Sequence, residues 1–218
     1  MHTSDDETYI PLTLARFGIR LVRMTEEDKE IVRLGRNKDF VRNNHLYRSI
    51  ITEAEQERWF VEMNSREHYV FIVIYKGKRI GVVYLRDIPE DLSISTCGLF
   101  FWEDEYISSR IPVFAAFLAL DFAVYFCEVQ QIKSIVLKTN EAGLKMYTFF
   151  GFELKENDAE SYVILISREI YLKRRETLIN FILRAVKNTA EHQLRFRGSQ
   201  CSLNYPVVNQ LLAQFSET

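Results

Sequence analysis

The sequence predicts an α/β (α+β) fold: a mixed, mostly antiparallel central sheet flanked by helices, followed by a helical C-terminal extension. Three observations support this fold class. Short alternating segments rich in β-branched residues recur along the chain up to residue 167. Segments with helix start signals separate them. Beyond residue 168 the apolar spacing becomes helical. We therefore expect a domain of residues 1–168 and an extension of residues 169–218.

The first elements that we expect are one strand and two helices. The alternating segment IRLVRM, residues 19–24, has the pattern of a strand. A helix over residues 25–43 follows, because its first turn is acidic. A second helix over residues 52–64 starts with Thr52 and has Glu55 three residues later, which is the pattern of a capping box.

Three strands and a long helix form the middle of the domain. Residues 69–75 and 80–88 are joined by KGKR, whose turn residues predict a hairpin, and residues 93–102 form the third strand. A helix over residues 112–127 then starts at Pro112. Proline is tolerated there because the first helical amide has no partner within the helix.

The last part of the domain alternates strand, helix and hairpin. Residues 134–139 are expected to form a strand, and Asn140 is expected to cap a helix that ends before Gly151. GFELKE and SYVILIS are then the two strands of a β-hairpin.

The extension has a different pattern. FRGSQCSLNYP is expected to be a loop and VVNQLLAQF a short helix. Residues 168–197 carry eight basic and three acidic side chains. We favour capping of the domain, or a homodimer contact through these helices, over a ligand-binding tail. Before that loop we expect a first helix, whose apolar face consists of Leu178, Ile179, Ile182, Leu183 and Val186.

Composition argues against several classes of protein. The net charge of −2 gives no sign of binding to nucleic acid or to a membrane surface. The longest apolar run, IPVFAAFLALDFAVYF, is interrupted by Asp121 and is too short to span a membrane. The three cysteines are far apart, which predicts no disulfide framework. With an acidic N-terminus that lacks an apolar signal core, this predicts a cytoplasmic protein.

The familiar motifs of metal, hydrolase and dinucleotide sites are missing from the sequence. The four histidines are widely separated, so we expect no metal site. The sequence contains no GxSxG, Walker or GxGxxG motif. Chemistry must therefore be sought in the order of the elements and in the segment NEAGLKMYTFFGF.

Three segments resemble the GNAT acetyltransferase superfamily, and the resemblance covers about residues 17–167. They are GIRLVRMTEEDKEIVRLGRN, GLFFWEDEYISSRIPVFAAFLALDFAVYF and VLKTNEAGLKMYTFFGFEL. The last matches the family's Asn-x6-Tyr-x3-Gly-Phe pattern at every marked position. The segments LGRNKDFVRNN and ITEAEQERWF also resemble members that act on nucleotide-linked amino-sugars or on ribosomal-protein N-termini.

The resemblance implies direct acetyl transfer from acetyl-CoA, as co-substrate and without a metal, to a primary amine. It assigns to Tyr147 the role of the acid that protonates the leaving thiolate. Phenol and thiol pKa values of about 10 and about 8.5 make this transfer feasible. The alternative is that Tyr147 is a core aromatic residue whose hydroxyl reaches the surface.

Two further residues are implied on the side of acetyl-CoA. Asn140 is expected to cap its helix with one oxygen and to lie near the pantetheine arm, since its amide donor stays free. The backbone N–H of Phe101 is expected to polarise the acetyl carbonyl. The Phe101 side chain is expected to belong to the core.

The segment ISSRIP, residues 107–112, departs from the family pattern. The family has a glycine-containing loop there, whose amides bind the pyrophosphate at a helix N-terminus. Pro112 removes one amide, whereas Ser108, Ser109 and Arg110 offer hydroxyl and guanidinium donors. We favour a reshaped loop that still binds the cofactor over a relative that has lost acetyl-CoA binding.

The acceptor side is implied by LGRNKDFVRNN and ITEAEQERWF. In a sugar-nucleotide enzyme, Arg36 and Arg42 would bind phosphates beside Asn37, and Trp59 would stack on a ring. Each arginine could equally lie on a solvated helix face, and Trp59 could belong to the core.

The general base is not identified by the sequence. His45 has a suitable ordinary pKa, although a lone histidine is often a surface residue. Glu103 and Asp104 could act through water. An acceptor amine of low pKa would need no base.

The sequence thus predicts an acetyl-CoA-dependent N-acetyltransferase acting on a primary amine of a small molecule, with a nucleotide-linked amino-sugar as first choice. The alternatives are a protein N-terminal acetyltransferase and a catalytically silent GNAT-fold binding or scaffold protein.

Overall fold

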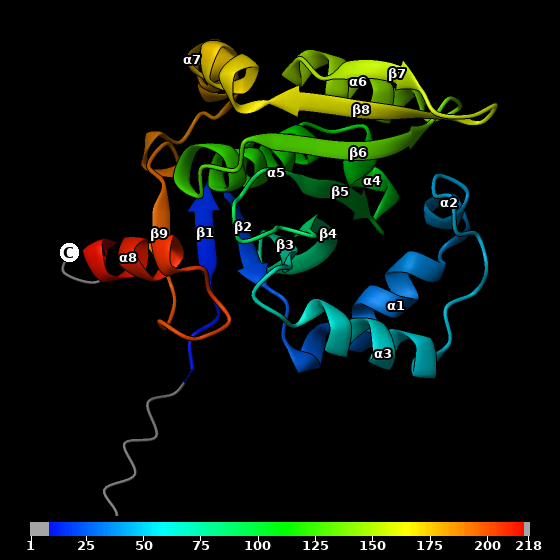
Figure 1. Ribbon diagram of the computed structural model, residues 1–218, viewed down its shortest axis with the longest axis horizontal. Coiled ribbons are helices and arrows are strands. Elements are labelled where there is room, and N and C mark those ends of the chain that lie inside the picture. Colours follow the sequence, from blue (N-terminus) through cyan, green and yellow to red (C-terminus); the bar gives the residue numbers. More distant parts are fainter. Residues whose placement is uncertain (1–8, 216–218) are drawn as a thin grey trace, which may run out of the picture.

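A computed structural model describes residues 9–215 of the 218-residue chain. Its centre is a nine-stranded sheet in the order β7-β8-β6-β5-β4-β3-β2-β1-β9 (Figure 1). Only the pair β5–β6 is parallel among these neighbours. This confirms the predicted mixed, mostly antiparallel sheet. The strands are β1 (Thr13–Arg16), β2 (Ile19–Arg23), β3 (Tyr69–Tyr75), β4 (Lys78–Arg86), β5 (Ser95–Phe101), β6 (Gln131–Leu137), β7 (Glu153–Glu156), β8 (Ser161–Ser167) and β9 (Arg195–Arg197).

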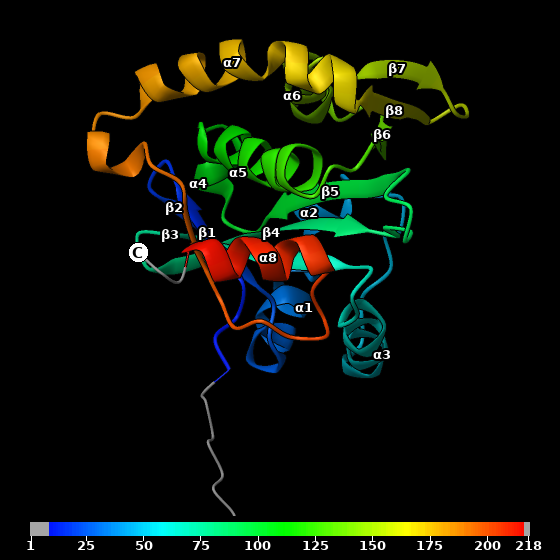
Figure 2. The same cartoon turned by 60° about the vertical axis from the view of Figure 1, so that its left-hand side comes forward.

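Helices cover both faces of the sheet. α5 lies on one face, against β2, β4 and β5, and α1 with α3 lies on the opposite face (Figure 2). The helical segments are η1 (Glu26–Asp28), α1 (Lys29–Asn37), α2 (Asp39–Arg42), α3 (Glu53–Met63), α4 (Asp104–Ile107), α5 (Ile111–Leu120), η2 (Asp121–Phe126), α6 (Glu141–Phe150), α7 (Arg168–Ala185), η3 (Thr189–Glu191) and α8 (Pro206–Phe215). No helix in residues 9–215 is long and apolar enough to cross a membrane.

Strand β3 is apolar on both faces because each face meets a helical layer. Successive side chains of a strand point to opposite faces. Tyr69, Phe71 and Val73 therefore enter the core beneath α5, whereas Val70 and Ile72 enter the smaller core beneath α1 and α3.

Several boundaries differ from the sequence prediction. The expected helix over residues 25–43 is divided, because Lys38 has an extended backbone between α1 and α2. The expected helix over residues 112–127 becomes α5 followed by the π-helical η2. Strand β1, which pairs with β2 across a turn at Gly18, was not predicted.

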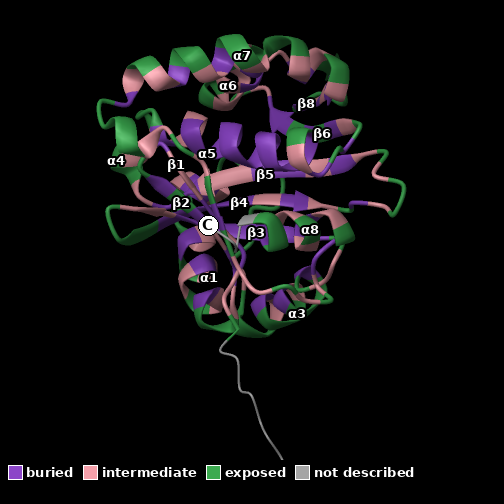
Figure 3. Cartoon of the chain, turned by 90° about the vertical axis from the view of Figure 1, so that its left-hand side faces the viewer, coloured by how far each residue is buried: buried purple, intermediate pink, exposed green. Residues whose placement is uncertain are grey.

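The C-terminal extension contributes to the sheet as well as to the helices. β9 pairs with β1, so part of the segment expected to be a loop is a strand. The predicted apolar face of α7 is confirmed, since Leu178 and Ile182, together with Val186 directly after the helix, are buried in the main core. Figure 3 shows α7 exposed on its outer side. The division into residues 1–168 and 169–218 stays a prediction.

Candidate active site

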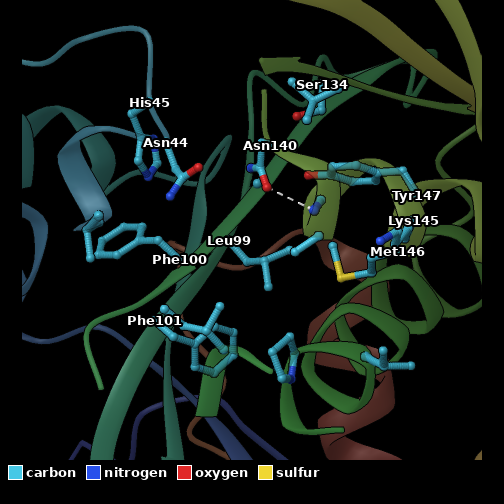
Figure 4. A pocket seen from close by; sticks show the side chains of 18 of the residues that line it. Asn44, His45, Leu99, Phe100, Phe101, Ser134, Asn140, Lys145, Met146 and Tyr147 are labelled. Atoms are coloured by element: carbon cyan, nitrogen blue, oxygen red, sulfur yellow. Dashed lines mark hydrogen bonds between the residues drawn. The ribbon is translucent and has the colours of Figure 1, made fainter. Parts of the chain in front are cut away.

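A cleft of about 440 Å³ opens where β5 and β6 separate (Figure 4). The parallel pairing of these strands is limited to Ser95 with Ile132 and Thr96 with Lys133. Beyond those pairs the C-terminal half of β5 and the middle of β6 form two walls of the cleft. Further lining residues come from α2 and the segment after it, from β4, from the end of α4 to the start of α5, and from helix α6.

The register of β5 directs two backbone amides toward this opening. In an antiparallel pair, only alternate residues exchange hydrogen bonds with the neighbouring strand. The Trp102 amide donates to the Ile80 carbonyl at 3.1 Å, in step with the β4–β5 pairing. Residues of the other parity, including Leu99 and Phe101, therefore turn their N–H groups away from β4 and toward the cleft. Either amide could polarise a carbonyl oxygen bound there.

Tyr147 projects from α6 into the cleft and is only 8% exposed. Its ring packs edge-on against Phe152, with centroids 5.1 Å apart. Burial raises the pKa of the hydroxyl well above its ordinary value, and a hydrogen bond with the Ser134 hydroxyl only partly offsets this. The phenol therefore stays protonated at neutral pH and is available as a proton donor.

Asn140 is the N-cap of α6, as the sequence predicts. Its side-chain oxygen accepts a hydrogen bond from the Gly143 amide at 2.9 Å. Asn140 also lines the cleft, beside Tyr147. The cap uses the oxygen, so the amide NH2 group is left as a donor for a bound molecule.

The segment of residues 107–112 forms local hydrogen bonds through Ser109. The Ser109 hydroxyl donates to the Tyr106 carbonyl at 2.7 Å and accepts from the Ile111 amide at 3.1 Å. The Ser109 amide also donates to the Tyr106 carbonyl. Two amides that could have bound a pyrophosphate are thus already used. Ser108 and Ser109 line the cleft, and the exposed Arg110 lies outside its lining.

His45 follows α2 and lines the opposite end of the cleft. Its half-buried ring stands edge-on to Phe100, with centroids 5.6 Å apart. Burial, and secondarily the positive charge of Arg36, lower the His45 pKa from 6.5 to about 4. The imidazole is therefore neutral at physiological pH.

The predicted acceptor residues Arg36, Asn37 and Arg42 lie outside the lining and hold the loop that carries His45. Arg36 donates to the Tyr47 carbonyl at 2.8 Å and Arg42 to the Arg48 carbonyl at 3.1 Å. The Asn37 side chain bonds the backbone of residue 51 in both directions. Arg36 Nη1 and Arg42 Nε are buried without a hydrogen-bond partner in the described structure.

Three other candidates also lie away from the cleft. Trp59 is half-buried against the core beneath α1 and α3. Glu103 lies 3.7 Å from the Lys38 ammonium, and Asp104 is exposed at the start of α4. None of the three lines the cleft.

Charge in the cleft is sparse and not acidic. Lys145 is the one permanently charged residue in the lining, which contains no Asp or Glu. In the described part of the chain, no group of His, Cys, Asp or Glu could hold a metal ion. The cleft thus offers backbone amides, hydroxyls and an apolar wall, but no anionic site for a polycation.

Ser134, Tyr84 and Gly98 are among the lining residues that the sequence analysis did not single out. A Cβ atom on Gly98 would lie 2.2 Å from the Tyr84 hydroxyl oxygen, so glycine lets the tyrosine cross β5. Tyr84 and Gly98 are partners in the β4–β5 register. A serine within an apolar strand was the one available signal for Ser134.

Comparison with known proteins agrees with this geometry. A family model described as an acetyltransferase (GNAT) domain matches residues 18–153. The chain belongs to the GNAT acetyltransferase family. This confirms the predicted family, and places the protein among N-acetyltransferases that use acetyl-CoA. A comparison with curated protein sequences finds no match.

Several solved GNAT structures share the fold of this acetyltransferase. FdhC, a nucleotide-linked sugar GNAT in its apo form, has a TM-score of 0.65 at 21% identity, covering 78% of this chain and 98% of its own. Aminoglycoside acetyltransferase AAC(6')-Ib with coenzyme A has a TM-score of 0.63 at 14% identity, and the match covers 72% of this chain and 99% of that one. Spermidine N-acetyltransferase from Vibrio cholerae, with CoA and spermine, has a TM-score of 0.61 at 17% identity, and the match covers 71% of this chain and 98% of that one.

Proposed function

We propose that this GNAT protein transfers the acetyl group of acetyl-CoA to a primary amine of a small molecule whose remaining groups are neutral or anionic. A nucleotide-linked amino-sugar is the class that fits best. The observation that carries the proposal is the absence of carboxylates from the cleft lining. A polyamine or an aminoglycoside is a polycation, and its recognition calls for negative potential.

The chain's own groups suit each part of the transfer. The amide of Leu99 or that of Phe101 would bind the carbonyl oxygen as negative charge develops on it. The Tyr147 hydroxyl would donate its proton to the departing sulfur. The free Asn140 amide group and the Ser108 hydroxyl would contact the rest of the bound acetyl-CoA.

Loss of the amine proton needs no strong base here. The neutral His45 imidazole could accept it, either directly or through water. An amine of low pKa, such as that of an amino-sugar, would already be partly neutral at pH 7. The proposal therefore assigns His45, at the acceptor end of the cleft, the role of an auxiliary proton acceptor and not that of a required base.

Two measurements test the proposal. Calorimetry with acetyl-CoA should show binding, and its absence at millimolar cofactor would favour a silent GNAT-fold protein. CoA release should then be followed with nucleotide-linked amino-sugars, spermidine, an aminoglycoside and peptides. We expect release with the amino-sugar nucleotide and none with the matching sugar nucleotide that has a hydroxyl in place of the amine. Preference for spermidine, an aminoglycoside or a peptide N-terminus would contradict the assigned acceptor class.

A further inference from the structure

A second, smaller cavity adjoins the cleft on the side of α5. Its volume is about 20 Å³ and its walls are apolar. A cavity of this size has room for about one water-sized group, and an apolar lining keeps such a space dry. It therefore suits a methyl or methylene group better than a water molecule.

The two cavities share three residues, Gly98, Leu99 and Tyr147. If the Leu99 amide binds the carbonyl oxygen and the Tyr147 hydroxyl faces the sulfur, the acyl carbon would lie beside residues that line both cavities. The substituent on that carbon would then lie close to the second cavity.

Small side chains keep this cavity open. Ala116 and Ala119 of α5 and Cys97 of β5 line it, and all three are buried. A larger side chain at any of these positions would fill a space of only about 20 Å³. The buried Phe150 ring also lines the cavity.

We infer that this cavity receives the end of the acyl chain, so that the protein also uses propionyl-CoA as an acyl donor. The inference rests on the proposed acyl transfer and adds one methylene to the same reaction. The amine nitrogen forms the new C–N bond, and the C–S bond breaks. The amine gives a proton to solvent, and the thiolate takes one from Tyr147, which solvent restores.

Affinities for acyl-CoA molecules test the inference without knowledge of the acceptor. Calorimetry with the full-length chain should compare acetyl-, propionyl- and butyryl-CoA. Burial of one further methylene group predicts that propionyl-CoA binds about three- to fourfold more tightly than acetyl-CoA. Butyryl-CoA should bind more weakly than propionyl-CoA, because the cavity has no room for a second methylene.

Two variants change the size of the cavity in opposite directions. Ala119→Val fills it and should remove the preference for propionyl-CoA over acetyl-CoA. Cys97→Ala enlarges it and should improve butyryl-CoA relative to propionyl-CoA. Cys127→Ala is the matched control, since Cys127 is also buried but lies outside both cavities. That control should leave the order of the three ligands unchanged.

Failure of this inference is distinguishable from failure of the proposed function. If no acyl-CoA binds, both fail together. If acetyl-CoA binds and propionyl-CoA binds tenfold more weakly, the inference is wrong and acetyl transfer stands. Each variant is read as a ratio of two affinities, so a general loss of stability cancels. The wild-type ligand series decides the matter even if a variant does not fold.

Discussion

The Tyr147 hydroxyl is the group on which the proposed chemistry depends most. It is buried, it faces the cleft, and its raised pKa keeps it protonated at neutral pH, so the proton is present when the thiolate leaves. Its ring packs on Phe152 and would be retained in phenylalanine. Removing only the oxygen therefore separates proton donation from packing.

We expect Tyr147→Phe to lower kcat by about 10²-fold or more while changing the Kd for acetyl-CoA little. Steady-state kinetics and calorimetry measure the two effects. Tyr162→Phe is the matched control, because Tyr162 lies on β8 outside the cleft lining. Near-wild-type turnover in Tyr147→Phe would contradict the acid role and favour the alternative that Tyr147 is only a core aromatic residue.

His45 gives the fold a pH dependence whose sign follows from its lowered pKa. The ordinary pKa is 6.5 and the folded value is about 4. Between these values the unfolded chain binds a proton that folded His45 does not, so stability falls as pH falls through that range. Above pH 6.5 both states are neutral at this site and the contribution is constant.

Urea unfolding at pH 7.5 and pH 5 should therefore show a smaller loss of stability for His45→Gln than for the wild-type chain. His2→Gln, outside the described residues, serves as the control for a change of one histidine. An equal loss in wild type and His45→Gln would show that the ring does not resist protonation in the folded protein.

At the scale of elements, a polar contact inside the core joins η2 to α7. Asp121 is fully buried and accepts hydrogen bonds from Arg175 Nε at 2.5 Å and Nη2 at 2.9 Å. The Tyr171 hydroxyl adds a third at 3.2 Å. Arg175 also lies over the Tyr125 ring, 4.0 Å from its centroid. Removing the bidentate partner of a buried carboxylate lowers the stability of the fold, because the remaining charge stays buried without compensation.

Arg175→Leu leaves the Asp121 charge buried without its ion pair, and we expect it to lower the free energy of unfolding by about 3–5 kcal/mol. Chemical denaturation measures the change. Lys173→Leu on the same helix breaks only an exposed pair with Glu169, at 2.6 Å, and should cost less than about 1 kcal/mol. Similar losses in both variants would mean that the Asp121 contact does not fix α7.

Elements with a long periodic pattern were predictable from the sequence, and those defined by pairing were not. Strand β3 was predicted with its observed limits, because its apolar run is long. Strand β9 has only three residues and is a strand because it pairs with β1, which is far away in the sequence. In the site, too, residues within a motif were predictable and residues placed by strand pairing were not. Tyr147 and Asn140 carry a motif, whereas Tyr84 reaches the cleft only through the β4–β5 register.

At the scale of the whole molecule, α7 presents an exposed aromatic residue to solvent. Phe181 is 59% exposed and contacts Phe149 of α6, with ring centroids 5.2 Å apart. A homodimer through the C-terminal helices would cover it. We expect Phe181→Asp to convert such a dimer to a monomer in sedimentation experiments, and Lys187→Asp to leave it intact. A wild-type protein that sediments as a monomer would contradict the homodimer.

Deleting the extension would not test that dimer, because residues beyond α7 complete the fold. Arg23 is 3% exposed, and its guanidinium donates to the Leu203 carbonyl at 2.9 Å and to the Asn204 side chain at 3.0 Å. The Tyr205 amide donates to the Tyr69 hydroxyl at 2.9 Å. These contacts join the C-terminal segment to the last residue of β2 and the first residue of β3.

A chain that stops after Val186 should therefore lose cooperative unfolding or become insoluble. It exposes the edge of β1 and leaves the buried Arg23 guanidinium without two of its acceptors. Asn204→Leu removes only one of these acceptors and, since it leaves a charged donor short of a partner, should cost about 1.5–3 kcal/mol while retaining the fold. Thermal unfolding followed by circular dichroism measures both. A soluble fragment of residues 1–186 that unfolds cooperatively and still binds acetyl-CoA would show that the GNAT domain is independent of β9 and α8.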